Sequence, residues 1–210
     1  TLAEIKKAYP KELHIHEGFL LREYLQYRIL DIIFASPYAE KLVFLGGTCL
    51  RIVHGNRRFS EDLDFDNLGL LRPEFAQVGA LVKQELELEG YEVTAEMAGV
   101  SAFRCRVSLP GLLFHHGLTG HKDQTVLIQL DTQPQQYNYE PEVWYMARWD
   151  VRQDIRCCPL PLLLLALALP ARPPGPPLLL SASGLTGTWP IWPTWPTAAG
   201  PDKMLPAVRA

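Results

Sequence analysis

Apolar residues recur every three to four positions in two stretches of the chain, which is the spacing of a helix with one buried face. The first stretch runs from Phe19 to Ile33 and is followed by Pro37, which disfavours a helical residue before it. The second runs from Arg72 to Glu89 and is followed by Gly90, a residue common just after a helix C-terminus. The pattern therefore predicts two amphipathic helices.

Short apolar runs and strict alternation mark other stretches as strands. Leu42-Val43-Phe44-Leu45 reads as a buried strand that stops at the glycine pair Gly46-Gly47, and a short helix is expected over residues 48–54. Further strands are predicted over 62–66, 91–97, 102–109 and 125–131. This order of elements predicts an α/β (α+β) domain in which a mixed sheet is flanked by helices.

Acidic and apolar residues alternate between residues 62 and 66. A strand there turns Asp62, Asp64 and Asp66 to one face and sends Leu63 and Phe65 to the core. Carboxylates two residues apart supply two of the oxygen ligands that Mg²⁺ (or Mn²⁺) requires. Asp62 and Asp64 are therefore predicted to be catalytic metal ligands, and Asp66 is expected to be solvated at the end of the strand.

A third carboxylate is expected from the predicted strand 125–131. Alternation places Leu127, Gln129 and Asp131 on one face of that strand. Asp131 is the candidate that completes the metal site or accepts a proton from an attacking hydroxyl.

The glycine turn and the basic loop after it are typical of a phosphate-binding segment. Glycine lets the backbone approach a phosphate, and a helix that begins there presents free N–H groups. Guanidinium groups hold β- and γ-phosphates well, and a hydroxyl adds a donor. The candidate nucleotide-binding residues are Gly46, Gly47, Thr48, Arg51, Arg58 and Ser60.

Neither signal is specific by itself. A Gly-Gly pair after a strand is usually a plain turn, and a DxD pair occurs on exposed strands and in sugar-nucleotide glycosyltransferases. The two together, in this order and separated by one short helix and a basic loop, favour nucleotidyl transfer from a nucleoside triphosphate to an acceptor hydroxyl.

At Gly46-Gly47-Thr48-Cys49-Leu50-Arg51 and Arg58-Phe59-Ser60-Glu61-Asp62-Leu63-Asp64-Phe65 the sequence resembles the AbiEii/AbiGii family of toxin nucleotidyltransferases, and the likeness extends over residues 17–156. The resemblance implies a polymerase-β-like nucleotidyltransferase fold, a magnesium ion and a nucleoside triphosphate donor. It further implies an antitoxin partner in a type IV toxin–antitoxin or phage-defence system and, for some relatives, transfer to the 3′ end of tRNA.

The character of the chain changes after residue 156. We therefore assign residues 1–156 to a nucleotidyltransferase-like domain and residues 157–210 to an aberrant tail rich in proline, leucine and tryptophan, without regular structure. The tail is either a proline-rich docked extension or the product of a shifted reading frame. A one-base shift of codons for Pro173-Pro174-Gly175-Pro176-Pro177 can encode arginine and glycine in an Arg-Gly-Arg order, close to what the resemblance places there. The family's C-terminal helical domain is then missing or disrupted.

Composition adds limits rather than a function. The net charge of −3 gives no global attraction to nucleic acid, so any such contact requires a local patch. The longest apolar run, residues 162–169, is shorter than the roughly 20 residues of a membrane span. Four cysteines without a CxxC spacing fit a cytoplasmic protein. Two main hypotheses remain, namely an active nucleotidyltransferase and an inactive remnant that only binds other proteins.

Overall fold

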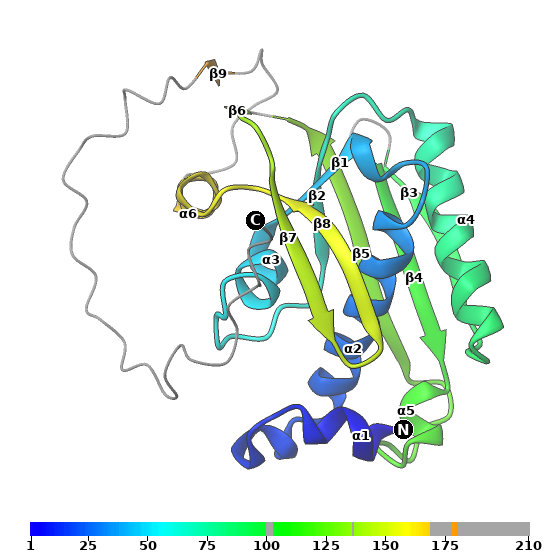
Figure 1. The fold of residues 1–210 in the computed structure, drawn as a ribbon. Coiled ribbons are helices and arrows are strands. Elements are labelled where there is room, and N and C mark those ends of the chain that lie inside the picture. Colours follow the sequence, from blue (N-terminus) through cyan, green and yellow to red (C-terminus); the bar gives the residue numbers. More distant parts are fainter. Residues whose placement is uncertain (100–102, 136, 169–177, 180–210) are drawn as a thin grey trace. The chain divides into compact units, whose positions relative to one another are not determined.

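The computed structural model describes residues 1–99, 103–135, 137–168 and 178–179 (Figure 1). The chain divides into one unit of residues 1–179 and a second of residues 180–210. The second unit, and with it most of the predicted tail, lies outside the described residues.

A seven-stranded sheet organises the first unit, with strand order β3-β4-β5-β2-β1-β8-β7. The pairs β2/β5 and β1/β8 are parallel and the other pairs are antiparallel. The mixed sheet of the predicted α/β fold is therefore confirmed. The strands are β1 Leu42–Leu45, β2 Leu63–Asn67, β3 Thr94–Ala98, β4 Phe103–Pro110, β5 Thr125–Pro134, β7 Glu142–Arg148 and β8 Val151–Cys157. A small parallel pair is formed by β6 Tyr137–Asn138 and β9 Leu178–Leu179.

The helices agree closely with the apolar spacing. α4 begins with a proline in its first turn, and Glu74 accepts a hydrogen bond from the Leu71 N–H at 2.7 Å, which satisfies a donor that the helix leaves free. The helix after β1 starts at Gly46, two residues earlier than expected. The α-helices are α1 Leu2–Lys7, α2 Glu17–Phe34, α3 Gly46–Ile52, α4 Arg72–Leu88, α5 Leu112–His115 and α6 Leu160–Ala168, and the 3₁₀ helices are η1 Lys11–Ile15 and η2 Ala39–Lys41.

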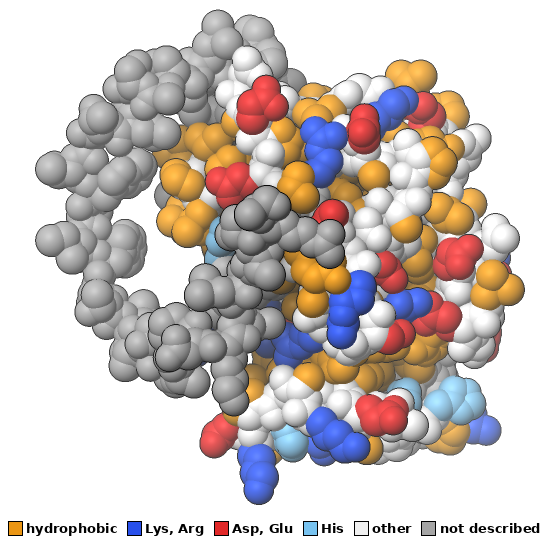
Figure 2. All heavy atoms as spheres, in the orientation of Figure 1, with side chains coloured by type: hydrophobic (Ala, Val, Ile, Leu, Met, Phe, Trp, Pro, Cys, Tyr) orange, Lys and Arg blue, Asp and Glu red, His pale blue; other side chains and the backbone are white. Residues whose placement is uncertain are grey.

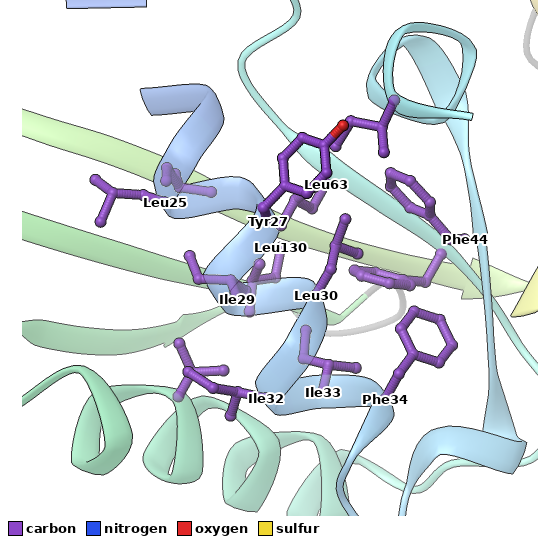
Figure 3. Close-up of a cluster of buried hydrophobic side chains, with 14 of the residues drawn as sticks. Leu25, Tyr27, Ile29, Leu30, Ile32, Ile33, Phe34, Phe44, Leu63 and Leu130 are labelled. Atoms are coloured by element: carbon purple, nitrogen blue, oxygen red, sulfur yellow. The ribbon is translucent and has the colours of Figure 1, made fainter. Parts of the chain in front are cut away.

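The hydrophobic core lies between α2 and the sheet. Ile29, Leu30 and Ile33 of α2 are fully buried and lie near Phe44, Leu63 and Leu130, which come from three neighbouring strands (Figure 3). Burying each such side chain contributes about 1.5–3 kcal/mol. Because side chains alternate along a strand, the residues between these core positions project from the opposite face of the sheet.

The helix α4 covers the same face as α2, over β3 and β4. Its Gly79 comes so close to the sheet that a Cβ there would lie 2.7 Å from Cys105 Sγ of β4. Cys105 therefore points towards α4, and its strand neighbours Arg104 and Arg106 point away from it.

Regular structure continues past the boundary that the sequence placed at residue 156. β8 runs to Cys157, and α6 follows and contacts α3. Leu162 and Leu163 are buried, so the apolar run supplies a packed helix rather than an irregular tail. None of the helices in the described part of the chain has the length and apolar character needed to cross a membrane.

Candidate active site

The glycine turn and the Asp-x-Asp strand meet at the C-terminal end of β1. Leu45 is the cross-strand partner of Asp64 in the antiparallel pair β1/β2. Gly46 follows with φ +80°, and a Cβ built on it would lie 2.1 Å from Asp64 Oδ2. Only glycine fits this backbone conformation and this close approach. The carboxylate of Asp64 thus lies directly against the turn.

The hydroxyl of Ser60 lies on the other side of the turn. A Cβ at Gly47 would be 2.9 Å from Ser60 Oγ. Ser60 is held there through its backbone, because the buried side chain of Gln26 donates to the carbonyl oxygens of Ser60 and Glu61, each at 3.0 Å. The loop between α3 and β2 therefore returns to the start of α3.

Asp131 joins the cluster through strand pairing. In the parallel pair β2/β5, Asp64 and Asp131 are partners, so both side chains project from the face opposite α2. Burial, followed by the charges of Asp131 and Asp62, raises the pKa of Asp64 to about 6. Burial and the Asp131 carboxylate also raise the pKa of Asp62. The three carboxylates are thus close enough to repel one another.

A residue that the sequence analysis did not identify neutralises part of this charge. Arg104 of β4 is the cross-strand partner of Asp131 and binds it with two contacts, Nε–Oδ1 at 2.7 Å and Nη2–Oδ2 at 3.0 Å. Gln129 Nε2 donates to Oδ2 at 3.0 Å. The sequence did contain a signal for Arg104. Alternation along the predicted strand 102–109 places Arg104 and Arg106 on the face opposite Cys105.

Thr48, which directly follows Gly46-Gly47 in the chain, lies in the protein interior. Its side chain is buried, and its hydroxyl donates to the carbonyl oxygen of Asp62. The side chain therefore anchors the segment that carries the acidic pair. A contact between the Thr48 backbone N–H and a phosphate stays a prediction.

The two predicted arginines occupy different environments. Arg51 forms a buried ion pair with Glu23, donates to the carbonyl oxygens of Asn56 and Arg57 at 3.1 and 2.8 Å, and stacks 3.8 Å from the centre of the Phe59 ring. These contacts favour a structural role for Arg51.

Arg58 is exposed, and its guanidinium makes no ion pair within the part of the chain that the structure describes. Its backbone N–H is bonded to Asn56 Oδ1 at 3.0 Å. Of the two arginines, Arg58 has the guanidinium that is available to a ligand.

Asp66 is not solvated, contrary to the expectation from its place at the strand end. It is 6% exposed and accepts a hydrogen bond from Tyr139 Oη at 2.6 Å, and burial raises its pKa to about 6. Alternation correctly placed Asp66 on the face of Asp62 and Asp64. It did not reveal that Tyr139, 73 residues later in the chain, covers this end of β2.

The chemistry of the site fits a divalent ion. Among the described residues, no three His, Cys, Asp or Glu side chains are already arranged around one metal position. The donors Asp62, Asp64 and Asp131 are nevertheless carboxylates, which hard cations prefer. Their mutual repulsion is the condition that a bound cation relieves.

The chain matches a known protein family and is similar to solved structures. The family described as "Nucleotidyl transferase AbiEii toxin, Type IV TA system" matches residues 28–137, just over half of the chain and a range that contains the whole acidic cluster. Curated protein sequences give no match. Among solved structures, the chain is similar to MenT4, a nucleotidyltransferase toxin from Mycobacterium tuberculosis H37Rv, and to JHP933 from Helicobacter pylori.

These structural similarities concern the fold. MenT4 is 18% identical with a TM-score of 0.49, and the match covers 76% of this chain and 55% of MenT4. For JHP933 the values are 20% identity, a TM-score of 0.45, and coverage of 70% and 54%. The chain thus spans a little over half the length of these relatives.

Proposed function

Because this chain belongs to the family of AbiEii nucleotidyltransferase toxins of type IV toxin–antitoxin systems, we propose that it transfers a nucleoside monophosphate from a nucleoside triphosphate to an acceptor hydroxyl. The observation that carries the proposal is the contact between Asp64 and the Gly46 turn, with Asp131 alongside. An anion-binding turn placed against carboxylates requires a cation between them and the triphosphate.

Three carboxylates would act on that cation and on the acceptor. Asp62 and Asp64 would hold Mg²⁺ (or Mn²⁺), which when bound neutralises the triphosphate and stabilises the leaving pyrophosphate. Asp131 would take the proton of the attacking hydroxyl. The hydroxyl oxygen then forms a bond to the α-phosphorus, while the bond from this phosphorus to the bridging oxygen breaks and releases pyrophosphate.

The turn and its loop would hold the triphosphate. Gly46 and Gly47 let the backbone approach it, and the first turn of α3, which begins at Gly46, has backbone N–H groups without a partner inside the helix. The Ser60 hydroxyl lies at the same turn, and the Arg58 guanidinium, which makes no ion pair with any described residue, would hold the β- and γ-phosphates. These groups would orient the α-phosphate towards Asp131.

The proposal extends to the partner and to the acceptor of the transfer. Family membership supports a cognate antitoxin as partner. The acceptor would be an RNA such as tRNA, with a protein hydroxyl as the alternative. A second candidate function is that of an inactive remnant that only binds a protein, because the amino-acid sequence of residues 157–210 departs from the pattern of the family.

The test is incorporation of labelled nucleotide from each nucleoside triphosphate, with and without Mg²⁺. Asp64→Ala should abolish metal-dependent incorporation. The control Asp123→Ala removes an exposed acid from the loop before β5 and should keep wild-type incorporation. Equal incorporation by Asp64→Ala and wild type would refute the assignment. A wild-type chain without saturable, Mg²⁺-dependent nucleotide binding would establish the remnant.

A further inference from the structure

Two arginines project from β4 on the face of the sheet that α2 and α4 leave uncovered. Cys105 and Val107 are buried towards the helices, whereas Arg104 and Arg106 are exposed. The close contact between Gly79 of α4 and Cys105 fixes which face is which. The arginines therefore share a face with Asp131.

Strand pairing places these arginines in a row beside the third carboxylate. Arg104 is the partner of Asp131 and Arg106 is the partner of Gln129, while Leu127, further along the same face of β5, is 41% exposed. We call Arg104, Arg106, Leu127 and Gln129 the β4–β5 strip. The strip extends from Asp131 on the side away from the Gly46 turn, because β5 and β4 follow β2 in the strand order.

Among the described residues, only one of the two arginines of the strip is paired with a carboxylate. Arg104 is paired with Asp131, but Arg106 makes neither an ion pair nor a side-chain hydrogen bond within the described residues. Its cross-strand partner on β3 is Glu96, which is also exposed and forms no ion pair with it. Among the described residues, the guanidinium of Arg106 is therefore unpaired, and Arg106 lies on β4 two residues from Arg104, the partner of Asp131.

We propose that the β4–β5 strip binds phosphate groups near the 3′ end of a single-stranded RNA acceptor, an inference that rests on the proposed nucleotidyl transfer. If the triphosphate occupies the Gly46 turn, the acceptor reaches Asp131 from the other side, where the strip lies. Arg104 and Arg106 are two residues apart on a strand, roughly 6.6 Å, a separation similar to that of successive phosphates in an extended strand.

The chemistry of the strip favours RNA over a protein acceptor. Guanidinium groups form paired hydrogen bonds with phosphate oxygens, and an exposed leucine offers an apolar contact for a ribose or base. A protein hydroxyl brings no evenly spaced anions that would use both arginines. Because the overall charge of −3 does not attract RNA, RNA binding requires a local positive patch such as this strip.

The experiment measures the binding of a short, dye-labelled single-stranded RNA by fluorescence anisotropy, without nucleotide and over a series of salt concentrations. Arg106→Gln should weaken binding about tenfold at low salt and lower the slope of log affinity against log salt by about one. Lys83→Gln removes an exposed positive charge from α4, on the other face of the sheet, and should leave binding unchanged.

Three results would overturn the strip: wild-type chain that does not bind the RNA, Arg106→Gln that binds as well as wild type, or an equal loss in Lys83→Gln. If RNA binding depends on Arg106 while nucleotide incorporation is absent, the RNA surface is supported and the enzymatic proposal is rejected.

Discussion

Two clusters of arginine and carboxylate groups lie in the same domain and differ in accessibility. In the first, Glu23 lies between Arg51 and Arg148, with side chains that are 3%, 9% and 28% exposed. In the second, Asp131 (26% exposed) is bound by Arg104 (45% exposed) and lies beside Asp64, with Asp62 close enough to be affected by its charge. The first has two cations for one anion, and the second has three anions for one cation.

The first cluster satisfies its charges from within the chain. Carbonyl oxygens accept further hydrogen bonds from both arginines, as Ala8 does from Arg148 at 3.0 Å. Arg148 also lies 4.3 Å from the Tyr9 ring and 4.7 Å from the Trp149 ring, so aromatic faces complete its surroundings. This cluster joins α2, the loop after α3 and the β7–β8 hairpin.

The second cluster leaves negative charge in excess. One guanidinium does not neutralise three carboxylates, and the pKa values of Asp62 and Asp64 are raised by burial and by this repulsion. Figure 2 shows acidic and basic side chains interspersed over the face viewed there. A cluster whose charged groups find their partners within the chain stabilises the fold, whereas one with excess negative charge is suited to a cation.

The largest effect is expected from neutralising the first cluster. Glu23→Gln leaves two arginines buried without their counter-ion, so unfolding by denaturant should show a loss of about 3 kcal/mol or more. The control Glu87→Gln breaks an exposed pair with Lys83 and should cost less than about 0.5 kcal/mol. Similar small losses for both variants would mean that Glu23 does not hold the elements together.

A second test separates the close contact between Gly46 and Asp64 from the positive φ of the glycine. Gly46 and Gly55 both have positive φ, +80° and +71°, but nothing lies within 4 Å of a Cβ at Gly55. Gly55→Ala should cost about 1–2 kcal/mol of stability. Gly46→Ala adds a clash with Asp64 and should cost about 1–3 kcal/mol more, with loss of nucleotide incorporation. Equal thermal stabilities would contradict the close contact with Asp64.

The smallest effect concerns the balance of the second cluster. Arg104→Gln removes the cation that competes for Asp131, so the affinity for Mn²⁺ should rise about threefold to tenfold, as measured by titration calorimetry. Arg106→Gln, on the same strand but without contact to Asp131, is the matched control and should change Mn²⁺ affinity less. Weaker Mn²⁺ binding by Arg104→Gln would show that the guanidinium supports the metal site instead.

Helices α2, α3 and α4 and strands β1 to β5 followed from local patterns, whereas α1, α5, β7 and β8 were not predicted. The spacing of Phe19 to Ile33 predicted α2, and the alternation after Glu61 predicted both β2 and the shared face of its acids. The α6 helix was missed because prolines beside an apolar run suggested an irregular tail, whereas Leu162 and Leu163 find a packing surface near α3. Periodicity is a property of neighbouring residues, but such a surface comes from elsewhere in the chain.

The sequence by itself predicted the type of fold, the glycine turn and the shared face of Asp62 and Asp64, because helices, strands and turns follow from patterns among neighbouring residues. Only the tertiary structure decided which arginine serves which purpose. Arg51 is buried on Glu23, 28 residues away, and Arg104 is paired with Asp131, 27 residues away. The pairing of distant segments sets the burial and charge around each guanidinium, and these determine whether it stabilises the fold or remains accessible to a ligand.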